Sequence, residues 1–138
     1  MDIMKNKVER HLKSHKKHGK PVLFLLIDSE NFKTSKDVEK MAKGIMKACK
    51  KMTAAPAILV GGSSATDQIE MNNVVKIIKK ITRLDTILFP GNITGVVPKA
   101  DAILFSSLMN SENPYYITQA QALGAPLVRK FNLEALPT

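Results

Sequence analysis

The chain has 138 residues, 44% of them apolar, and a formal net charge of +9, which predicts one basic globular domain and excludes a disordered chain. A basic surface favours nucleic acid, an anionic membrane face or a phosphorylated metabolite as partner, but the absence of Trp and the 5% aromatic content argue against nucleic acid. No apolar run approaches the ~20 residues of a membrane span, no signal peptide is visible, and Cys49 is the lone cysteine, so we expect a cytoplasmic protein.

The first twenty residues are rich in Lys and Arg and are predicted to form a helix over residues 2–18, with an apolar stripe at Met4, Val8 and Leu12. This basic helix is interpreted either as a solvated face or as a membrane-surface element. Its three histidines follow helical spacing, which suggests a metal site: His11, His15 and His18. Lysines surround them and no acidic partner is evident, so we interpret them as solvated.

After residue 20 the sequence alternates strands with helices. Apolar runs predict strands at Val22–Ile27, Ala57–Val60, Thr86–Phe89 and Ala102–Ser106, with the approach to a fifth at Leu133–Thr138. Helices are predicted after a capping box at Thr34 and Asp37, from Asp67 to Thr82, and between Asn113 and Gly124. Residues 92–99 are too short for a full helix, so the third helix is predicted to be atrophied. The alternation predicts a parallel α/β sheet, either open and doubly wound or half of an eight-stranded barrel.

Polar, turn-forming residues follow each predicted strand, and in a parallel α/β fold these ends share one rim. Asp28 ends the first strand, with Glu30 and Asn31 behind it. Paired acids at the end of a strand suit Mg²⁺, which takes one or two carboxylates and completes its shell with water and substrate phosphate. The alternative is a turn that caps the following helix.

The second strand ends in glycines and serines, a combination that lets backbone N–H groups approach an anion just before a helix. A serine hydroxyl can add a metal ligand, and the alternative is a tight turn with an N-cap. The third strand ends in Pro90, Gly91 and Asn92. We take the following as candidate substrate-binding residues: Gly61, Gly62, Ser64, Pro90, Gly91 and Asn92.

Six segments occur in a fixed order: Leu26–Asp28, Val60–Ser63, Ile87–Asn92, Ala100–Phe105, Leu108–Tyr115 and Gln121–Ala125. From about residue 21 to the end this set resembles the archaeal geranylgeranylglyceryl phosphate synthases, prenyltransferases of ether-lipid synthesis. The resemblance implies a modified TIM barrel without its third helix. It also implies transfer of a geranylgeranyl group from its diphosphate to the 3-hydroxyl of sn-glycerol 1-phosphate, with Mg²⁺ as cofactor.

The resemblance further implies that Asp28 and Ser63 are metal ligands, with Asp28 as the catalytic residue, and that apolar residues near Ile93–Val97 line a prenyl groove. The family usually has Asp-Pro-Asp-Lys at its first strand, where this chain has Asp-Ser-Glu-Asn at residues 28–31.

Length sets the second expectation, because a TIM barrel takes about 250 residues. Residues 1–138 are therefore predicted to form a single incomplete (β/α)-barrel domain, the N-terminal half. The resemblance implies that the other half of the barrel carries the residues that bind glycerol phosphate. Half a barrel exposes two sheet edges, so we expect a homo-oligomer or pairing with a missing C-terminal half. The alternatives are an inactive half-barrel that binds polyprenyl diphosphate or anionic membrane, and another phosphate-handling TIM-barrel enzyme.

Overall fold

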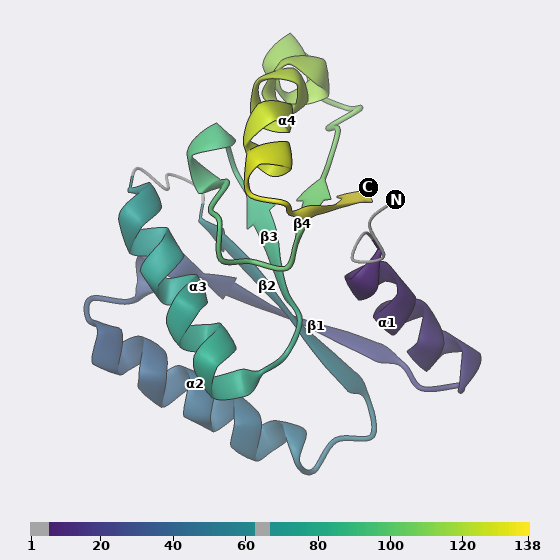
Figure 1. The fold of residues 1–138 in the computed structure, drawn as a ribbon, viewed down its shortest axis with the longest axis vertical. Coiled ribbons are helices and arrows are strands. Elements are labelled where there is room, and N and C mark those ends of the chain that lie inside the picture. Colours follow the sequence, from purple (N-terminus) through teal and green to yellow (C-terminus); the bar gives the residue numbers. More distant parts are fainter. Residues whose placement is uncertain (1–5, 63–66) are drawn as a thin grey trace.

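The computed structural model describes residues 6–62 and 67–138, in which five strands form one parallel sheet (Figure 1). The strands are β1 (Val22–Asp28), β2 (Ala55–Gly62), β3 (Thr86–Pro90), β4 (Ala102–Phe105) and β5 (Glu134–Pro137). The α-helices are α1 (Lys7–Lys17), α2 (Ser35–Cys49), α3 (Gln68–Thr82) and α4 (Ala120–Lys130). None of the helices described is long and apolar enough to cross a membrane.

The strand order decides between the two architectures that the sequence left open. The strands are neighbours in chain order, β1-β2-β3-β4-β5, and every pair is parallel. A doubly wound sheet reverses direction at a switch point, whereas a barrel wall grows in one direction only. The sheet is therefore half of a barrel, as predicted, and over the described residues the outer edges of β1 and β5 pair with no other strand.

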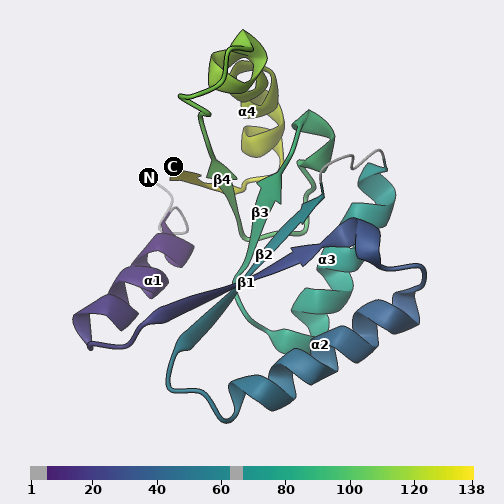
Figure 2. The same cartoon turned by 180° about the vertical axis from the view of Figure 1, so that it is seen from behind.

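The two faces of the sheet have different cores, because successive side chains of a strand point to opposite faces. Ile58, Leu88 and Ile103 pack outward in the core that α2 and α3 cover. Their sequence neighbours Ala57 and Ile87 point to the inner face, together with Val8 of α1. Figures 1 and 2 accordingly show α2 and α3 together on one side and α1 on the other.

The connection from β3 to β4 contains no α-helix, which confirms the prediction of an atrophied third helix. A single 3-10 turn, η2 (Ile93–Gly95), takes its place. Gly95 is required there, because a Cβ atom at this position would lie 2.7 Å from Cβ of Pro90. The segment folds back onto the end of β3, and Val96 and Val97 are buried in the outer core.

The last helix differs from its prediction, which ended it before Gly124. A π-helical turn over Tyr115–Gln119 leads directly into α4, and α4 runs through Gly124 and Pro126 to Lys130. Burial of Val128, which is 8% exposed in the outer core, outweighs the poor helix propensity of Gly and Pro. The left-handed residue that follows the helix is Asn132, with φ 53°.

Helix α1 starts at Lys7, and Asn6 before it has φ 80°. The part of the predicted helix before residue 6, with Met4, lies outside the described residues. A carboxylate from the far end of the chain caps α1. Glu134 of β5 accepts the backbone N–H of Val8 at 2.7 Å and that of Glu9 at 2.8 Å. Free N–H groups at a helix start attract negative charge, so this contact attaches α1 to the last strand.

Replacing Glu134 with Gln is expected to lower the free energy of unfolding by about 1.5–3 kcal/mol, because the substitution removes the charge from two partly buried hydrogen bonds. Denaturant unfolding measures the loss, and hydrogen exchange at the amides of residues 8 and 9 should accelerate. The control is Glu39→Gln, which disturbs only a solvent-exposed pair with Lys43 at 3.7 Å. Equal losses in the two variants would mean that the cap does not stabilise α1.

Candidate functional site

A pocket of about 370 Å³ lies at the carboxyl ends of the first four strands. Residues from η2 and α4 complete its walls, and its lining is mainly apolar. Six of the eight residues singled out from the sequence line it: Asp28, Gly61, Gly62, Pro90, Gly91 and Asn92. The other two, Ser63 and Ser64, lie outside the described residues.

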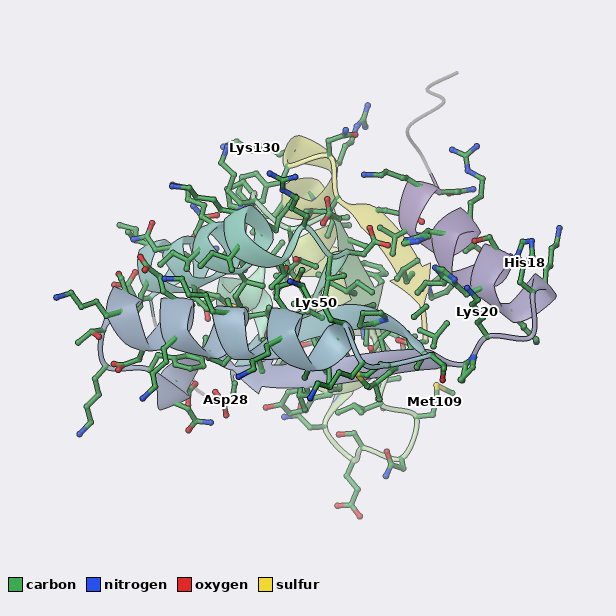
Figure 3. All side chains as sticks on the ribbon, turned by 90° about the horizontal axis from the view of Figure 1, so that it is seen from below. His18, Lys20, Asp28, Lys50, Met109 and Lys130 are labelled. Carbon is green, nitrogen blue, oxygen red and sulfur yellow. The ribbon has the colours of Figure 1, made fainter. Side chains whose placement is uncertain are left out.

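The sheet register explains why these residues meet. Asp28 lies beside Gly61, Gly61 beside Phe89, and Gly62 beside Pro90, so three strand ends form one continuous rim. The carboxyl ends of parallel strands share one edge, and turn-forming residues that follow such strands must gather there. Figure 3 shows Asp28 at one end of β1 and, at the other end, His18 and Lys20 of the segment that joins α1 to β1.

Asp28 has a structural contact as well as a place in the pocket. Its Oδ1 atom accepts the backbone N–H of Glu30 at 3.0 Å and caps the short turn η1 (Ser29–Asn31). Asp28 therefore does cap a turn, as the alternative interpretation proposed, but this cap uses only one of its oxygens. A carboxylate has about four acceptor positions, so others are still available. The remaining capacity suits a hard cation at the pocket rim.

The described residues fit a Mg²⁺ site only if water and substrate phosphate supply the other ligands. Among the described residues, no group of three or more His, Cys, Asp or Glu side chains is placed to hold a metal. Mg²⁺ is commonly bound by one or two carboxylates with water and substrate phosphate. Asp28 would be the carboxylate that holds the ion, and the ion would supply positive charge next to a phosphorylated substrate.

Gly61 is required by packing. A Cβ atom there would lie 2.7 Å from the carbonyl oxygen of Phe89 and 3.9 Å from Cδ1 of Leu26. The sequence suggested that glycine is needed here so that an anion can approach the backbone. The structure gives a second reason, which is the close contact between β2 and β3. Both requirements exclude a side chain at residue 61, which lines the pocket.

Asn92 shapes the turn at the end of β3. Its Oδ1 atom accepts the backbone N–H of Thr94 at 2.9 Å and is also bonded by the Thr94 hydroxyl. These contacts cap η2 and place Ile93 and Val96 in the pocket wall. The apolar residues expected near Ile93–Val97 thus lie beside the polar rim.

The sequence reasoning missed the wall that comes from α4. Gln121 lines the pocket, and its Nε2 atom donates to the carbonyl of Ser106 and, at 3.3 Å, to the carbonyl of Tyr116. These bonds join α4 to the end of β4, and Oε1 of Gln121 is buried with no hydrogen-bond partner among residues 6–62 and 67–138. Sequence spacing gave no signal for this residue, because its partners are backbone groups whose position depends on the π-helical turn.

The histidines of α1 lie away from this rim. The expectation that they have no acidic partner was wrong. His11 has an acidic partner, because its Nδ1 atom contacts Oδ2 of Asp85, 74 residues later in the chain. Asp85 comes from the turn before β3, which faces α1 only after the sheet has formed.

The family model described as the PcrB family matches residues 14–138. The chain belongs to the PcrB family. Proteins named geranylgeranylglyceryl phosphate synthase are its curated relatives. That of Nitrosopumilus maritimus is 63% identical over 139 aligned residues, covering 96% of this chain and 51% of the relative. That of Pyrococcus furiosus is 46% identical, covering 95% and 49%.

Two solved structures share the fold of this PcrB-family chain. The (S)-3-O-geranylgeranylglyceryl phosphate synthase of Thermoplasma acidophilum, in complex with its substrate sn-glycerol-1-phosphate, matches with a TM-score of 0.78 and 30% identity. The Thermoplasma volcanium enzyme matches with a TM-score of 0.75 and 27% identity. This chain is covered to 99% in both comparisons, but it spans only 51% and 50% of those chains. It therefore corresponds to about half of a PcrB-family barrel.

Proposed function

We propose that this chain is the N-terminal half of a prenyltransferase that moves a geranylgeranyl group from its diphosphate to sn-glycerol 1-phosphate. The observation that carries the proposal is a single pocket that joins Asp28 and two glycine-rich strand ends to an apolar wall from η2 and α4. An allylic diphosphate has the same two parts, a charged head and a long hydrocarbon chain.

The polar end of the pocket suits the diphosphate. Departure of that group leaves negative charge, which a bound Mg²⁺ neutralises. Asp28 would hold the ion, and the short glycine side of the rim would let the diphosphate oxygens come close to the backbone of residues 61 and 62. Because the turn η1 holds the Asp28 side chain, the carboxylate is oriented before substrate arrives.

The apolar wall suits the prenyl chain. Ile93, Val96 and Phe105 line the pocket where a longer crossover helix would otherwise pack. The short crossover therefore leaves the hydrocarbon space beside the rim. Burial of the chain there supplies binding energy at roughly 25 cal/mol per Å² of apolar surface.

The second substrate requires residues that this chain does not supply, in our proposal. The Thermoplasma acidophilum relative binds sn-glycerol-1-phosphate as a barrel about twice as long. We infer that a C-terminal half provides the glycerol phosphate site and closes the barrel against β1 and β5.

The inner face of the sheet supports this pairing. Phe24 is 46% exposed and Leu26 is 62% exposed on β1, and Phe89 is 43% exposed on β3. These side chains occupy the positions that face the interior of a closed barrel. An exposed apolar sheet face with two free edges favours association with another chain.

Mixing this chain with the C-terminal half of the Nitrosopumilus maritimus relative is expected to give a 1:1 complex, whereas this chain alone is expected to self-associate. Size-exclusion chromatography with light scattering measures both. Phe24→Lys should weaken the pairing, because it places a charge on the inner face, and Lys43→Gln on the outer surface of α2 is the control. A stable monomer that ignores the added half would disprove the pairing.

The test of the proposed reaction supplies the paired halves with geranylgeranyl diphosphate, sn-glycerol 1-phosphate and Mg²⁺ and follows product formation. Product that requires both halves supports the prenyltransferase. The second candidate is an inactive half-barrel that binds prenyl diphosphate. The observation that favours it is that residues of this chain alone form the pocket. Binding of prenyl diphosphate without turnover in the paired sample would select that candidate.

A further inference from the structure

His11 and His15 lie one turn apart on α1, at the end of the sheet away from the pocket. Their Nε2 atoms are 2.9 Å apart, and their ring centroids are 4.6 Å apart. The other nitrogen of His11, Nδ1, contacts the carboxylate of Asp85. The three side chains therefore form a row, carboxylate to imidazole to imidazole, that joins α1 to the turn before β3.

The carboxylate determines which nitrogen of His11 is available. A carboxylate oxygen accepts hydrogen bonds, so the pattern assigns the N–H of neutral His11 to Nδ1. The lone pair of Nε2 then points toward His15. Imidazoles that bind metals commonly donate their second N–H to a carboxylate, which fixes the ring orientation and makes the ligating nitrogen more basic.

The spacing of the two imidazoles suits one metal ion. Transition metals bind imidazole nitrogen at about 2.0–2.1 Å, which places two such nitrogens roughly 3.4 Å apart in a tetrahedral shell. The 2.9 Å contact between the Nε2 atoms is a hydrogen bond, in which His15 donates to His11 when His11 carries its hydrogen on Nδ1. Metal binding would replace this hydrogen bond and would require the His15 tautomer with its hydrogen on Nδ1. The side chain of His11 is 51% exposed, so solvent can complete the coordination shell.

We propose that His11 and His15 form a two-imidazole site for a divalent transition-metal ion such as Zn²⁺, with Asp85 as the residue that positions His11. Imidazole ligands favour Zn²⁺, Cu²⁺ and Ni²⁺ over Mg²⁺, so this site is chemically distinct from the proposed Mg²⁺ site at Asp28. Only two protein ligands would hold the ion, since no group of three or more His, Cys, Asp or Glu side chains in the described residues is placed to hold a metal, and solvent would complete the coordination shell. Bound metal would stiffen α1 and, through His11 and Asp85, its attachment to the turn before β3.

Titrating the ¹⁵N-labelled protein with ZnCl₂ and recording histidine ring nitrogens by NMR tests the site. We expect large shifts of Nε2 of His11 and His15 at one equivalent of Zn²⁺. His18 is the internal control, because it follows the last residue of α1, with its Nδ1 atom 2.7 Å from the carbonyl oxygen of Ser14, and is not part of the row. MgCl₂ at the same concentration should shift none of the three.

Variants separate the ligands from the positioning residue. His11→Ala and His15→Ala should each remove the saturable site, and His18→Ala should leave it intact. Asp85→Asn should lower the Zn²⁺ affinity by about 10–100-fold while the His11 and His15 shifts persist at higher metal. Thermal unfolding gives a second readout: Zn²⁺ should raise the Tm of the wild type and of the His18 variant, should raise that of Asp85→Asn only at higher metal, and should leave the His11 and His15 variants unchanged. Equal responses of His18 and His15, or unchanged affinity in the His15 variant, would overturn the proposal.

Discussion

Replacing Asp28 with Asn is expected to lower prenyl transfer by the paired halves at least about 100-fold, the size of effect seen when one preorganised electrostatic contact to the reacting charge is lost. Asn keeps a side-chain oxygen that can still accept the N–H of Glu30, so the turn η1 should survive. The substitution therefore removes charge from the rim with little change in fold. Steady-state product formation at several Mg²⁺ concentrations measures the loss and any increase in the Mg²⁺ requirement.

The matched control is Glu30→Gln, which neutralises an acid two residues further along the same turn. Glu30 is exposed and is not among the residues that line the pocket. We expect a much smaller loss of activity and an unchanged Mg²⁺ requirement. If Asp28→Asn retained wild-type turnover, Asp28 would have no role in holding the metal, whatever the outcome for Glu30.

Replacing Gly61 with Ala is expected to lower the free energy of unfolding by about 1–3 kcal/mol, the usual cost of forcing an extra methyl group into a packed site. The new Cβ atom would lie 2.7 Å from a backbone carbonyl oxygen, that of Phe89, and a backbone atom cannot rotate away as a side chain can. Strands β2 and β3 must separate locally, which displaces the pocket lining at Gly61 and Phe89. Urea denaturation measures the change, and prenyl diphosphate binding should weaken in parallel.

Gly44→Ala is the matched control: it makes the same glycine-to-alanine change, but we expect it to raise the free energy of unfolding. Gly44 lies within α2, and a Cβ atom there would meet nothing within 4 Å. Alanine has a higher helix propensity than glycine, so this variant should be stabilised by up to about 1 kcal/mol. If both variants had the same stability change, close contact with Phe89 would not be what requires glycine at residue 61.

Much of the fold could be predicted because its signals are local. Strand β1 appears in the sequence as an unbroken apolar run. The capping box of Thr34 and Asp37 is present at the start of α2, with the Thr34 nitrogen 2.9 Å from Oδ2 of Asp37. The short crossover was evident from residues 92–99, which contain too few helix-forming positions. The candidate rim followed from these elements, since polar residues after parallel strands must lie together.

The sequence by itself determined the strands, the first helices and the polar residues at the strand ends, because neighbouring residues encode periodicity, caps and turns. Only the tertiary structure decided the contacts between distant segments: Glu134 capping α1, Asp85 orienting His11, and Gln121 closing the pocket wall. It also decided that α4 continues through Pro126, where burial of Val128 outweighs local propensity. Such contacts depend on how the sheet brings remote residues together, and no local pattern carries that information.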